Sequence, residues 1–223
     1  MLRIPTQLIL SLACVFSLAA YAPTASAAFV TTGAPDTNIF YFGDPDTTSY
    51  GQTFKALDSV LTDWSFYVAG ATGNFDLRVA NWDGSKAVGP QLFSVSSTTA
   101  ATSASSLGNT KYSWSGINLS LATGSTYIAY ITVAGVSGPT AQVPVGGHSS
   151  DAYADGGFFF LNSGGADPLS SSDSWSSWFV PDMAFEANFA SASPVPEPAS
   201  LAAWSFGLVA VTFARRRKAK ATA

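Results

Sequence analysis

The amino-acid sequence predicts an all-β fold, an antiparallel β-sandwich or jelly roll, flanked by two apolar terminal segments. Of the 223 residues, 47% are hydrophobic, 13% are aromatic and only 11% are charged, which is too apolar for a disordered chain. Its 19 glycines and 12 prolines are typical of short strands joined by turns. Because the apolar segments alternate and none has the 3.6-residue stripe of a helix, two packed sheets are expected.

Residues 1–27 have the pattern of a secretory signal peptide. Arg3 precedes an uncharged apolar run from Leu8 to Ala22, and Ala25-Ser26-Ala27 forms a small-residue site for signal peptidase. We expect cleavage to leave Ala28 at the mature N-terminus; the alternative is an uncleaved anchor. The single cysteine, Cys14, would be removed with the peptide, so the mature chain should contain no disulfide, cysteine metal site or cysteine nucleophile.

Residues 28–190 form the predicted ectodomain. A continuous apolar run at 127–133 predicts a central strand, and the alternation at 183–189 places Met183, Phe185, Ala187 and Phe189 on one face. About nine strands are expected, at 38–42, 50–54, 64–68, 75–79, 91–95, 112–119, 127–133, 157–161 and 183–189. Three segments rich in Ser, Thr or Gly, at 94–106, 146–157 and 170–178, are expected to be irregular, the first as a connection or weak edge strand.

The charge distribution excludes one class of partner. Residues 28–193 contain four basic and 13 acidic residues, a net charge of −9, whereas five basic residues cluster at 215–220. Nucleic-acid binding needs a basic patch on the folded surface, so it is not expected here.

No catalytic residue is assigned from the sequence. His148, the single histidine, is followed by Ser149, Ser150 and Asp151, but adjacency in a loop does not form a catalytic triad, and no G-x-S-x-G motif is present. We therefore expect His148 to be a solvated loop residue. Glu186 is the single glutamate of the body, and nothing marks the carboxylate pair that a glycosidase needs. A surface hydrolase is the least favoured function.

Calcium is the cofactor that the residue types favour, because oxygen ligands are available while histidine and cysteine are scarce. The candidate ligands are Asp44 with Asp46, and Asp151 with Asp155. The alternative is that these carboxylates are simply solvated.

Tryptophan side chains are candidates for glycan contact, since exposed aromatic faces stack on sugar rings. Trp64 alternates with core positions and is expected inside the sandwich. Trp82, Trp114, Trp175 and Trp178 lie in or near turns, where they could form a sugar platform or pack against the ends of the sandwich.

The C-terminus combines three features in a fixed order. Residues 191–198 form a proline-rich linker containing Val195-Pro196-Glu197-Pro198, and residues 199–214 form an uncharged apolar segment. As a transmembrane helix that segment would be about 24 Å long, short of the roughly 30 Å hydrocarbon core. Arg215, Arg216 and Arg217 open the basic tail at 215–223 and are expected to stop the helix with the tail in the cytoplasm.

This C-terminus resembles the PEP-CTERM protein-sorting signal of Gram-negative bacteria, which consists of a Pro-Glu-Pro motif, a short transmembrane helix and an Arg-rich end. The resemblance implies recognition by an exosortase, a membrane-embedded cysteine transpeptidase-like enzyme, and cleavage near the motif. It implies an exported protein with an inner-membrane intermediate, destined for the cell surface or extracellular matrix and associated with exopolysaccharide and biofilm. The alternative is a plain proline-rich stalk on a single-pass anchor.

The body carries a more diffuse resemblance. Tyr50-Gly51-Gln52-Thr53-Phe54, Trp64-Ser65-Phe66 and Asn81-Trp82-Asp83-Gly84, with Asp151-Ala152-Tyr153 and the final Ala184-Phe185 strand, look like carbohydrate-binding-module-like sandwiches. That resemblance implies architecture more than activity. It also carries the alternative function, a module with specific glycan affinity.

Overall fold

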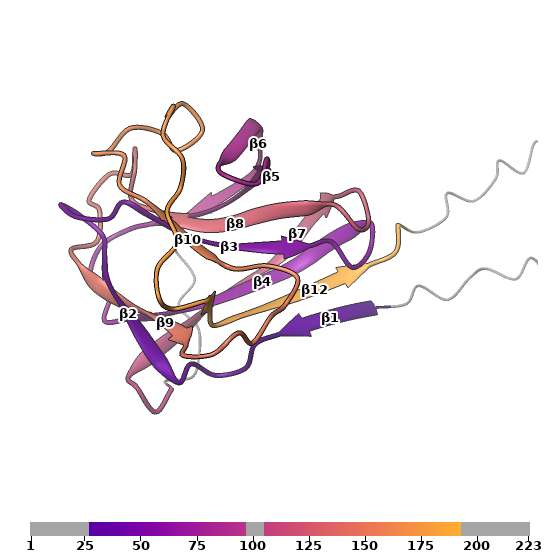
Figure 1. Ribbon diagram of the computed structural model, residues 1–223, viewed down its shortest axis with the longest axis horizontal. Helices are drawn as coiled ribbons and strands as arrows, with labels where there is room; N and C mark the ends of the chain where they lie inside the picture. Colours follow the sequence, from indigo (N-terminus) through magenta and orange to yellow (C-terminus); the bar gives the residue numbers. More distant parts are fainter. Residues whose placement is uncertain (1–26, 97–104, 193–223) are drawn as a thin grey trace, which may run out of the picture. The chain divides into compact units, whose positions relative to one another are not determined.

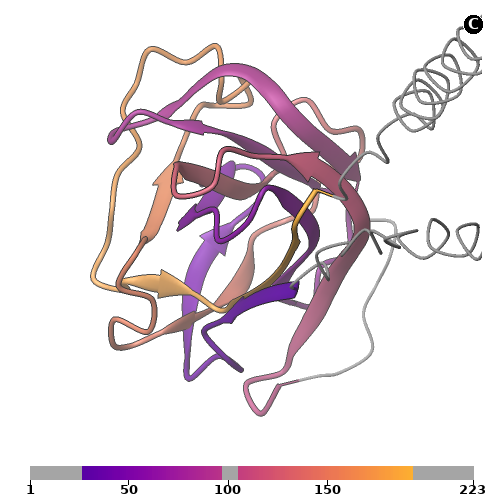
Figure 2. The same cartoon turned by 90° about the vertical axis from the view of Figure 1, so that its right-hand side faces the viewer.

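The structure, a computed structural model, describes residues 27–96 and 105–192, which fold into two antiparallel sheets (Figures 1 and 2). The predicted all-β fold is confirmed for these residues, which contain no helix and hence none that could span a membrane. The signal peptide except Ala27, the sorting motif, the apolar segment and the basic tail lie outside the described residues.

The strands range from two to twelve residues in length, and their connections include both short turns and long segments. The strands are β1 (Ala27–Thr31), β2 (Thr37–Phe42), β3 (Ser49–Lys55), β4 (Val60–Ala69), β5 (Asp76–Trp82), β6 (Ala87–Ser96), β7 (Asn109–Ser120), β8 (Thr126–Thr132), β9 (Val143–His148), β10 (Phe158–Leu161), β11 (Asp182–Met183) and β12 (Phe185–Ala190). One sheet has seven strands, in the order β1-β12-β4-β9-β11, with β2 on β9 and β7 on β4. The other has five, in the order β10-β3-β8-β5-β6, so the apolar β8 is central, as predicted.

An aromatic core lies between the sheets. Trp64 of β4 is fully buried, stacks on Phe185 of β12 at 5.0 Å between ring centroids, and contacts Phe54 of β3 at 4.8 Å. A second, smaller cluster covers the outer face of the five-stranded sheet beneath the long connection from β10 to β11. It contains Ala80, Ala87, Ile128, Tyr130, Leu161 and Trp175. Aromatic residues therefore stabilise both the sandwich and this connection.

A polar contact joins the two sheets inside the core. The Gln52 side chain donates to the Asp182 carboxylate at 2.8 Å and accepts from the Met183 backbone N–H at 2.8 Å. The Asp182 carboxylate also accepts the backbone N–H groups of Ala152 and Tyr153, at 2.8 and 3.0 Å. Burial raises the pKa of Asp182 despite these hydrogen bonds. This one side chain thereby fixes β3, β11 and the connection after β9 to one another.

The structure corrects the expectation of an irregular segment at 146–157, because residues 146–148 belong to strand β9 and not to a loop. A Cβ atom on Gly146 would lie 2.8 Å from the Pro35 ring, and one on Gly147 would lie 2.9 Å from Ile39 and Val180. These glycines permit close packing of neighbouring chains and do not mark a turn. The expected single strand at 183–189 is also divided, since Met183 pairs with β9 and Phe185 with β4, although all four predicted core side chains are buried.

The two ends of the described chain lie side by side. Figure 1 shows β1 beside β12, and in the register of these two strands Ala27 is opposite Ala190. Beyond β12, the Ser191 hydroxyl donates to the Asp58 carboxylate at 2.7 Å, and the Ala192 N–H donates to the Ser59 hydroxyl at 2.8 Å. The chain therefore enters and leaves the body at the same end, next to the turn between β3 and β4.

Candidate functional site

A cleft of about 230 Å³ opens at the other end of the body. Strand β3 begins beside it, at Ser49 and Tyr50, and ends at Lys55, just before the turn that contacts Ser191 and Ala192. Four aromatic side chains line the cleft: Tyr41, Tyr50, Phe160 and Trp178. Three polar residues complete the lining: Asp46, Thr47 and Ser177. The cleft and the two chain ends thus lie at opposite ends of β3.

Tyr41 reaches the cleft through an irregularity in β2. The pairing of β2 with β9 shifts register between Ile39 and Phe42, and Tyr41 adopts a φ of 78°, in the left-handed region that disfavours side chains other than glycine. The Thr47 N–H donates to the Tyr41 carbonyl at 3.2 Å and holds this conformation. The ring is consequently turned outward and is 54% exposed.

Tyr50 forms a buried wall of the cleft. Its hydroxyl donates to the Phe40 carbonyl, and its ring meets the Phe160 ring at 6.4 Å between centroids. Burial raises the pKa of Tyr50 to about 12. The phenol is therefore neutral at physiological pH, and its hydroxyl remains a hydrogen-bond donor to the β2 backbone.

Trp178 and Ser177 belong to the long connection between β10 and β11. Just before them, Ser176 exchanges two backbone hydrogen bonds with Phe160, at 2.8 and 2.9 Å. Trp175 is buried against Tyr130, with ring centroids 5.4 Å apart, and against Trp82, at 6.2 Å. Trp178 remains 45% exposed, 6.4 Å from the Phe160 ring centroid. One buried tryptophan thus positions an exposed one.

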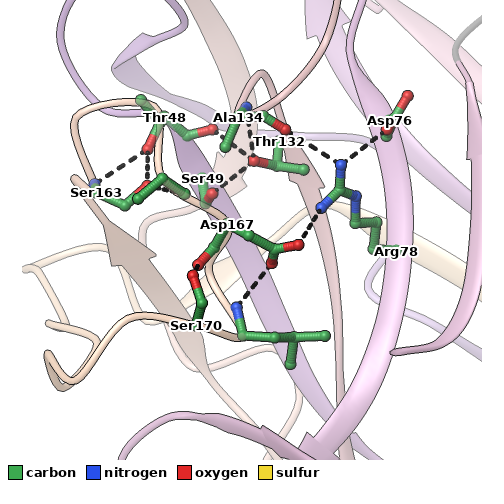
Figure 3. A network of polar contacts seen from close by, with 11 residues as sticks. Thr48, Ser49, Asp76, Arg78, Thr132, Ala134, Ser163, Asp167 and Ser170 are labelled. Carbon is green, nitrogen blue, oxygen red and sulfur yellow. Dashed lines mark hydrogen bonds and ion pairs between the residues drawn. The ribbon is translucent and has the colours of Figure 1, made fainter. Parts of the chain in front are cut away.

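Arg78 of β5 fixes the first half of the same connection (Figure 3). Its Nη2 donates to Asp76 at 3.0 Å and to the Ala134 carbonyl at 3.1 Å, while Nη1 lies 3.5 Å from the Asp167 carboxylate. Asp167 in turn accepts the Leu169 N–H at 2.9 Å. Because the Arg78 side chain is only 10% exposed, this ion pair is shielded from solvent on one side.

Hydroxyl groups supply a second attachment beside Arg78 (Figure 3). Thr48 Oγ1 is 3.2 Å from the Leu161 carbonyl and 3.0 Å from the Ser163 hydroxyl, and Ser49 is hydrogen-bonded to Thr132 at 2.7 Å. The Thr48 contacts tie the end of β10 to the start of β3, on which the cleft is built, and the Ser49 contact ties β3 to β8.

The cleft carries negative charge and no positive charge. Among the described residues that line it, Asp46 is the one with an ionisable carboxylate, and none is Lys, Arg or His. Exposed aromatic side chains continue around its rim: Phe40 is 51% exposed, and Phe179, whose ring lies 4.9 Å from Trp178, is 74% exposed.

Burial distinguishes between the two roles considered for the candidate tryptophans, a sugar platform or packing at the ends of the sandwich. Trp114 lies within β7 and Trp175 belongs to the second cluster; each is only 5% exposed, so neither offers a face to a ligand. Trp82 is half-buried against Phe159 at 4.7 Å. Trp178 alone of the four lines the cleft. Tyr41, Tyr50 and Phe160 were not predicted site residues, because alternation assigns them to strands without indicating their surroundings.

The candidate calcium ligands are spread over two connections. Asp44 and Asp46 lie between β2 and β3, and Asp151 and Asp155 lie between β9 and β10, where Asp155 is 4.0 Å from Lys55. Within 27–96 and 105–192, no three His, Cys, Asp or Glu side chains gather as they would around a metal ion. Calcium binding at these aspartates stays a prediction.

His148 is not the solvated loop residue that was expected. It ends β9 and is 6% exposed, with Nδ1 3.7 Å from the Asp36 carboxylate and a buried Nε2 that has no hydrogen-bond partner among the described residues. The Ser149 hydroxyl donates to Asp36 at 3.3 Å and not to His148. This arrangement is not that of a nucleophile activated by histidine.

Comparison with known families gives one match. Residues 194–218 match the PEP-CTERM protein-sorting motif, which confirms the resemblance stated above. The motif implies recognition by an exosortase, export, and processing at the membrane of a Gram-negative bacterium. No curated protein matches the chain.

Two solved structures are similar to the body. One contains the cysteine protease and lectin-like domains of Cwp84, a surface layer associated protein of Clostridium difficile, at 11% identity and a TM-score of 0.44 over 74% of this chain. The other is the infectious bursal disease virus Gt strain, at 11% identity and a TM-score of 0.26 over 80% of this chain. The chain spans 36% and 43% of those chains. At TM-scores below 0.5, neither likeness bears on function.

Proposed function

We propose that this protein is exported with the signal peptide at 1–27, held in the inner membrane by residues 199–214, and cut near Pro196-Glu197-Pro198 by an exosortase. The processed body then resides at the cell surface or in the extracellular matrix, in association with exopolysaccharide, as part of a biofilm. The observation that carries the proposal is the sorting motif at residues 194–218.

The geometry of the body supports processing at both termini. Ala27 is opposite Ala190, so the two processed segments join the body at one end, far from the cleft. Ala28, the predicted first residue after cleavage by signal peptidase, already lies in β1 opposite Phe189. Because a protease needs an extended and unpaired substrate, signal-peptide removal precedes the pairing of β1 with β12.

A non-catalytic role fits the polar groups of the body. His148 Nε2 is buried, Ser149 contacts Asp36, and the half-buried Glu186 is paired with Lys111 and the Tyr67 hydroxyl. Ser149 and Glu186 are thus engaged in structural contacts, and His148 Nε2 has no partner among the described residues that it could activate. The alternative, specific glycan affinity, is favoured by one observation, the aromatic cleft at the end away from the tether.

The test is the mass of the protein in membrane and medium fractions of the native host. Wild type should lose the tail beyond the motif only when the exosortase is present. Glu197→Ala and Pro196→Ala should insert normally and accumulate at full length, because residues 199–217 still insert and orient. Replacing Arg215, Arg216 and Arg217 with Ser should instead disturb orientation. A wild-type chain that keeps residues 199–223 in both backgrounds would contradict sorting and indicate an ordinary anchor.

A further inference from the structure

We propose that the cleft formed by Tyr41, Asp46, Tyr50, Phe160 and Trp178 binds one neutral pyranose unit of a polysaccharide. This inference rests on the proposed function, since association with exopolysaccharide supplies the ligand. The site shares Trp178 with the sugar platform considered from the sequence, but its other aromatic residues are different, and the ligand is narrowed to a neutral pyranose.

The size and the walls of the cleft fit a single sugar ring. Its volume of about 230 Å³ is below the roughly 300–1,000 Å³ of sites that enclose drug-sized ligands, so it can take one ring of a chain while the rest stays outside. Tyr41 of β2 and Trp178 of the connection between β10 and β11 line it with aromatic rings, and both residues are about half exposed. The C–H faces of a pyranose stack on such rings, whereas its hydroxyl groups need polar partners at the edge.

The polar lining matches the hydroxyl groups of a sugar. The Asp46 carboxylate accepts hydrogen bonds, and the Thr47 and Ser177 hydroxyls can both donate and accept. A few polar groups among aromatic walls are the usual arrangement for orienting a small ligand.

Charge selects between neutral and acidic polysaccharides. The cleft contains the Asp46 carboxylate without a basic lining residue, and residues 28–193 carry a net charge of −9. A uronate or sulfated unit would be repelled by both, so the ligand is neutral.

The conformation of Tyr41 also points to a role for its ring at the cleft. Its φ of 78° strains the backbone, and glycine would remove the strain. Its ring is 54% exposed, so the strain is not offset by burial in the core. A ligand-facing aromatic side chain accounts for a tyrosine at this position.

The experiment uses the full chain, purified in a detergent without a sugar headgroup, because glucoside or maltoside detergents would compete for the cleft. Calorimetry is performed with methyl glucoside, galactoside, mannoside and N-acetylglucosaminide in pyranose form, and with methyl glucuronide. At least one neutral glycoside should bind, and the glucuronide should bind at least about tenfold more weakly.

Variants locate the binding. Trp178→Ala and Asp46→Asn should each weaken the affinity for the bound glycoside about tenfold. Tyr41→Gly should weaken it similarly while the melting temperature stays equal or rises, a combination that a purely structural Tyr41 would not give. Phe29→Ala is the matched control: it removes a similarly exposed ring, at 54%, from β1 at the other end of the body, and it should bind as wild type does.

Retention on exopolysaccharide purified from the native host separates the two proposals. Loss of retention in Trp178→Ala but not in Phe29→Ala supports the cleft. The proposal of a sugar-binding cleft is overturned if both variants are retained as well as wild type, or if wild type binds no neutral glycoside. Either result leaves the proposed function intact. A protein partner would then be the occupant of this surface. Failure of wild type itself to be retained overturns the association with exopolysaccharide instead.

Discussion

The two ends of the body differ in how their connections are built. At the end where the chain enters and leaves, residues 56–59 form a short turn, and Ser191 and Ala192 contact it through Asp58 and Ser59. At the opposite end, longer connections at 43–48, 133–142 and 162–181 meet (Figure 1). A short turn can hold the departing chain at a fixed place, whereas long connections on a rigid scaffold can present side chains to a ligand.

The difference also appears in where aromatic side chains are exposed. Phe40, Tyr41, Trp178 and Phe179 are at least 45% exposed near the cleft, whereas Phe29 of β1 has a similar exposure at the tethered end. The cleft end therefore concentrates apolar surface that a purely structural end would bury. Trp175, Arg78 and Thr48 show how that end stays ordered nonetheless, since each attaches the long connection to the five-stranded sheet.

The largest expected effect is a difference in stability between variants of the two tryptophans in the connection from β10 to β11. Trp175→Ala should lower the free energy of unfolding by about 3–5 kcal/mol, because it opens a cavity in the second cluster. Trp178→Ala should change it by no more than about 0.5 kcal/mol, because nearly half of that side chain is exposed. Urea unfolding followed by far-ultraviolet circular dichroism measures both. Equal losses would show that Trp178 is structural.

A pH-dependent effect should arise at Asp182, which joins the sheets between the two ends. The Asp182→Asn variant should cost about 1–3 kcal/mol of stability, because the amide nitrogen would face donors. Because burial raises the pKa of Asp182, its ionisation opposes folding, so its contribution to stability is greatest below its unfolded pKa and declines as the pH rises through the folded pKa. The stability of wild type relative to Asp182→Asn should thus fall between pH 3 and neutrality. A difference independent of pH would contradict this.

Ser191→Ala probes the tethered end. The hydrogen bond from Ser191 is the main cause that lowers the pKa of Asp58, so this pKa should return toward its ordinary value in the variant. The stability that this pair adds is present above the unfolded pKa of Asp58 and is lost as the pH falls through the lowered one. NMR titration of Asp58 measures the change, with Ser149→Ala as a control at a serine bonded to a different aspartate. If the pKa of Asp58 did not change, the chain would leave the body at Ala190 without the contact from Ser191.

The smallest expected effect is a gain. Tyr41→Gly removes a left-handed strain of about 1–2 kcal/mol, whereas the greater freedom of glycine in the unfolded chain costs about 0.5–1 kcal/mol, so stability should rise by about 0–1.5 kcal/mol. Thermal unfolding is the measurement. A clear decrease would mean that the Tyr41 ring stabilises the cleft end, which would weaken the contrast between the two ends.

Local sequence patterns predicted most of the sandwich but little of the cleft. Alternation and turn residues located β3, β4, β8 and the buried face at Met183–Phe189, since these signals depend on neighbours in the sequence. The Gly146-Gly147 pair indicated a loop, whereas the strand there depends on Pro35, Ile39 and Val180, which are distant in sequence. Likewise, composition cannot distinguish Trp175 from Trp178 or reveal the bulge at Tyr41, because burial and register are set by tertiary contacts.

The central claim is that one end of the body connects to the sorting signal that directs processing, and that the opposite end binds polysaccharide. It is tested most directly by comparing Glu197→Ala and Trp178→Ala in cultures of the native host, measuring by mass and abundance the protein in membrane, matrix and free medium. The account predicts that Glu197→Ala stays in the membrane at full length. Trp178→Ala should be processed at the wild-type rate but shift from the matrix into the free medium. Release of Glu197→Ala, or a Trp178→Ala protein that remains in the matrix as wild type does, would contradict it.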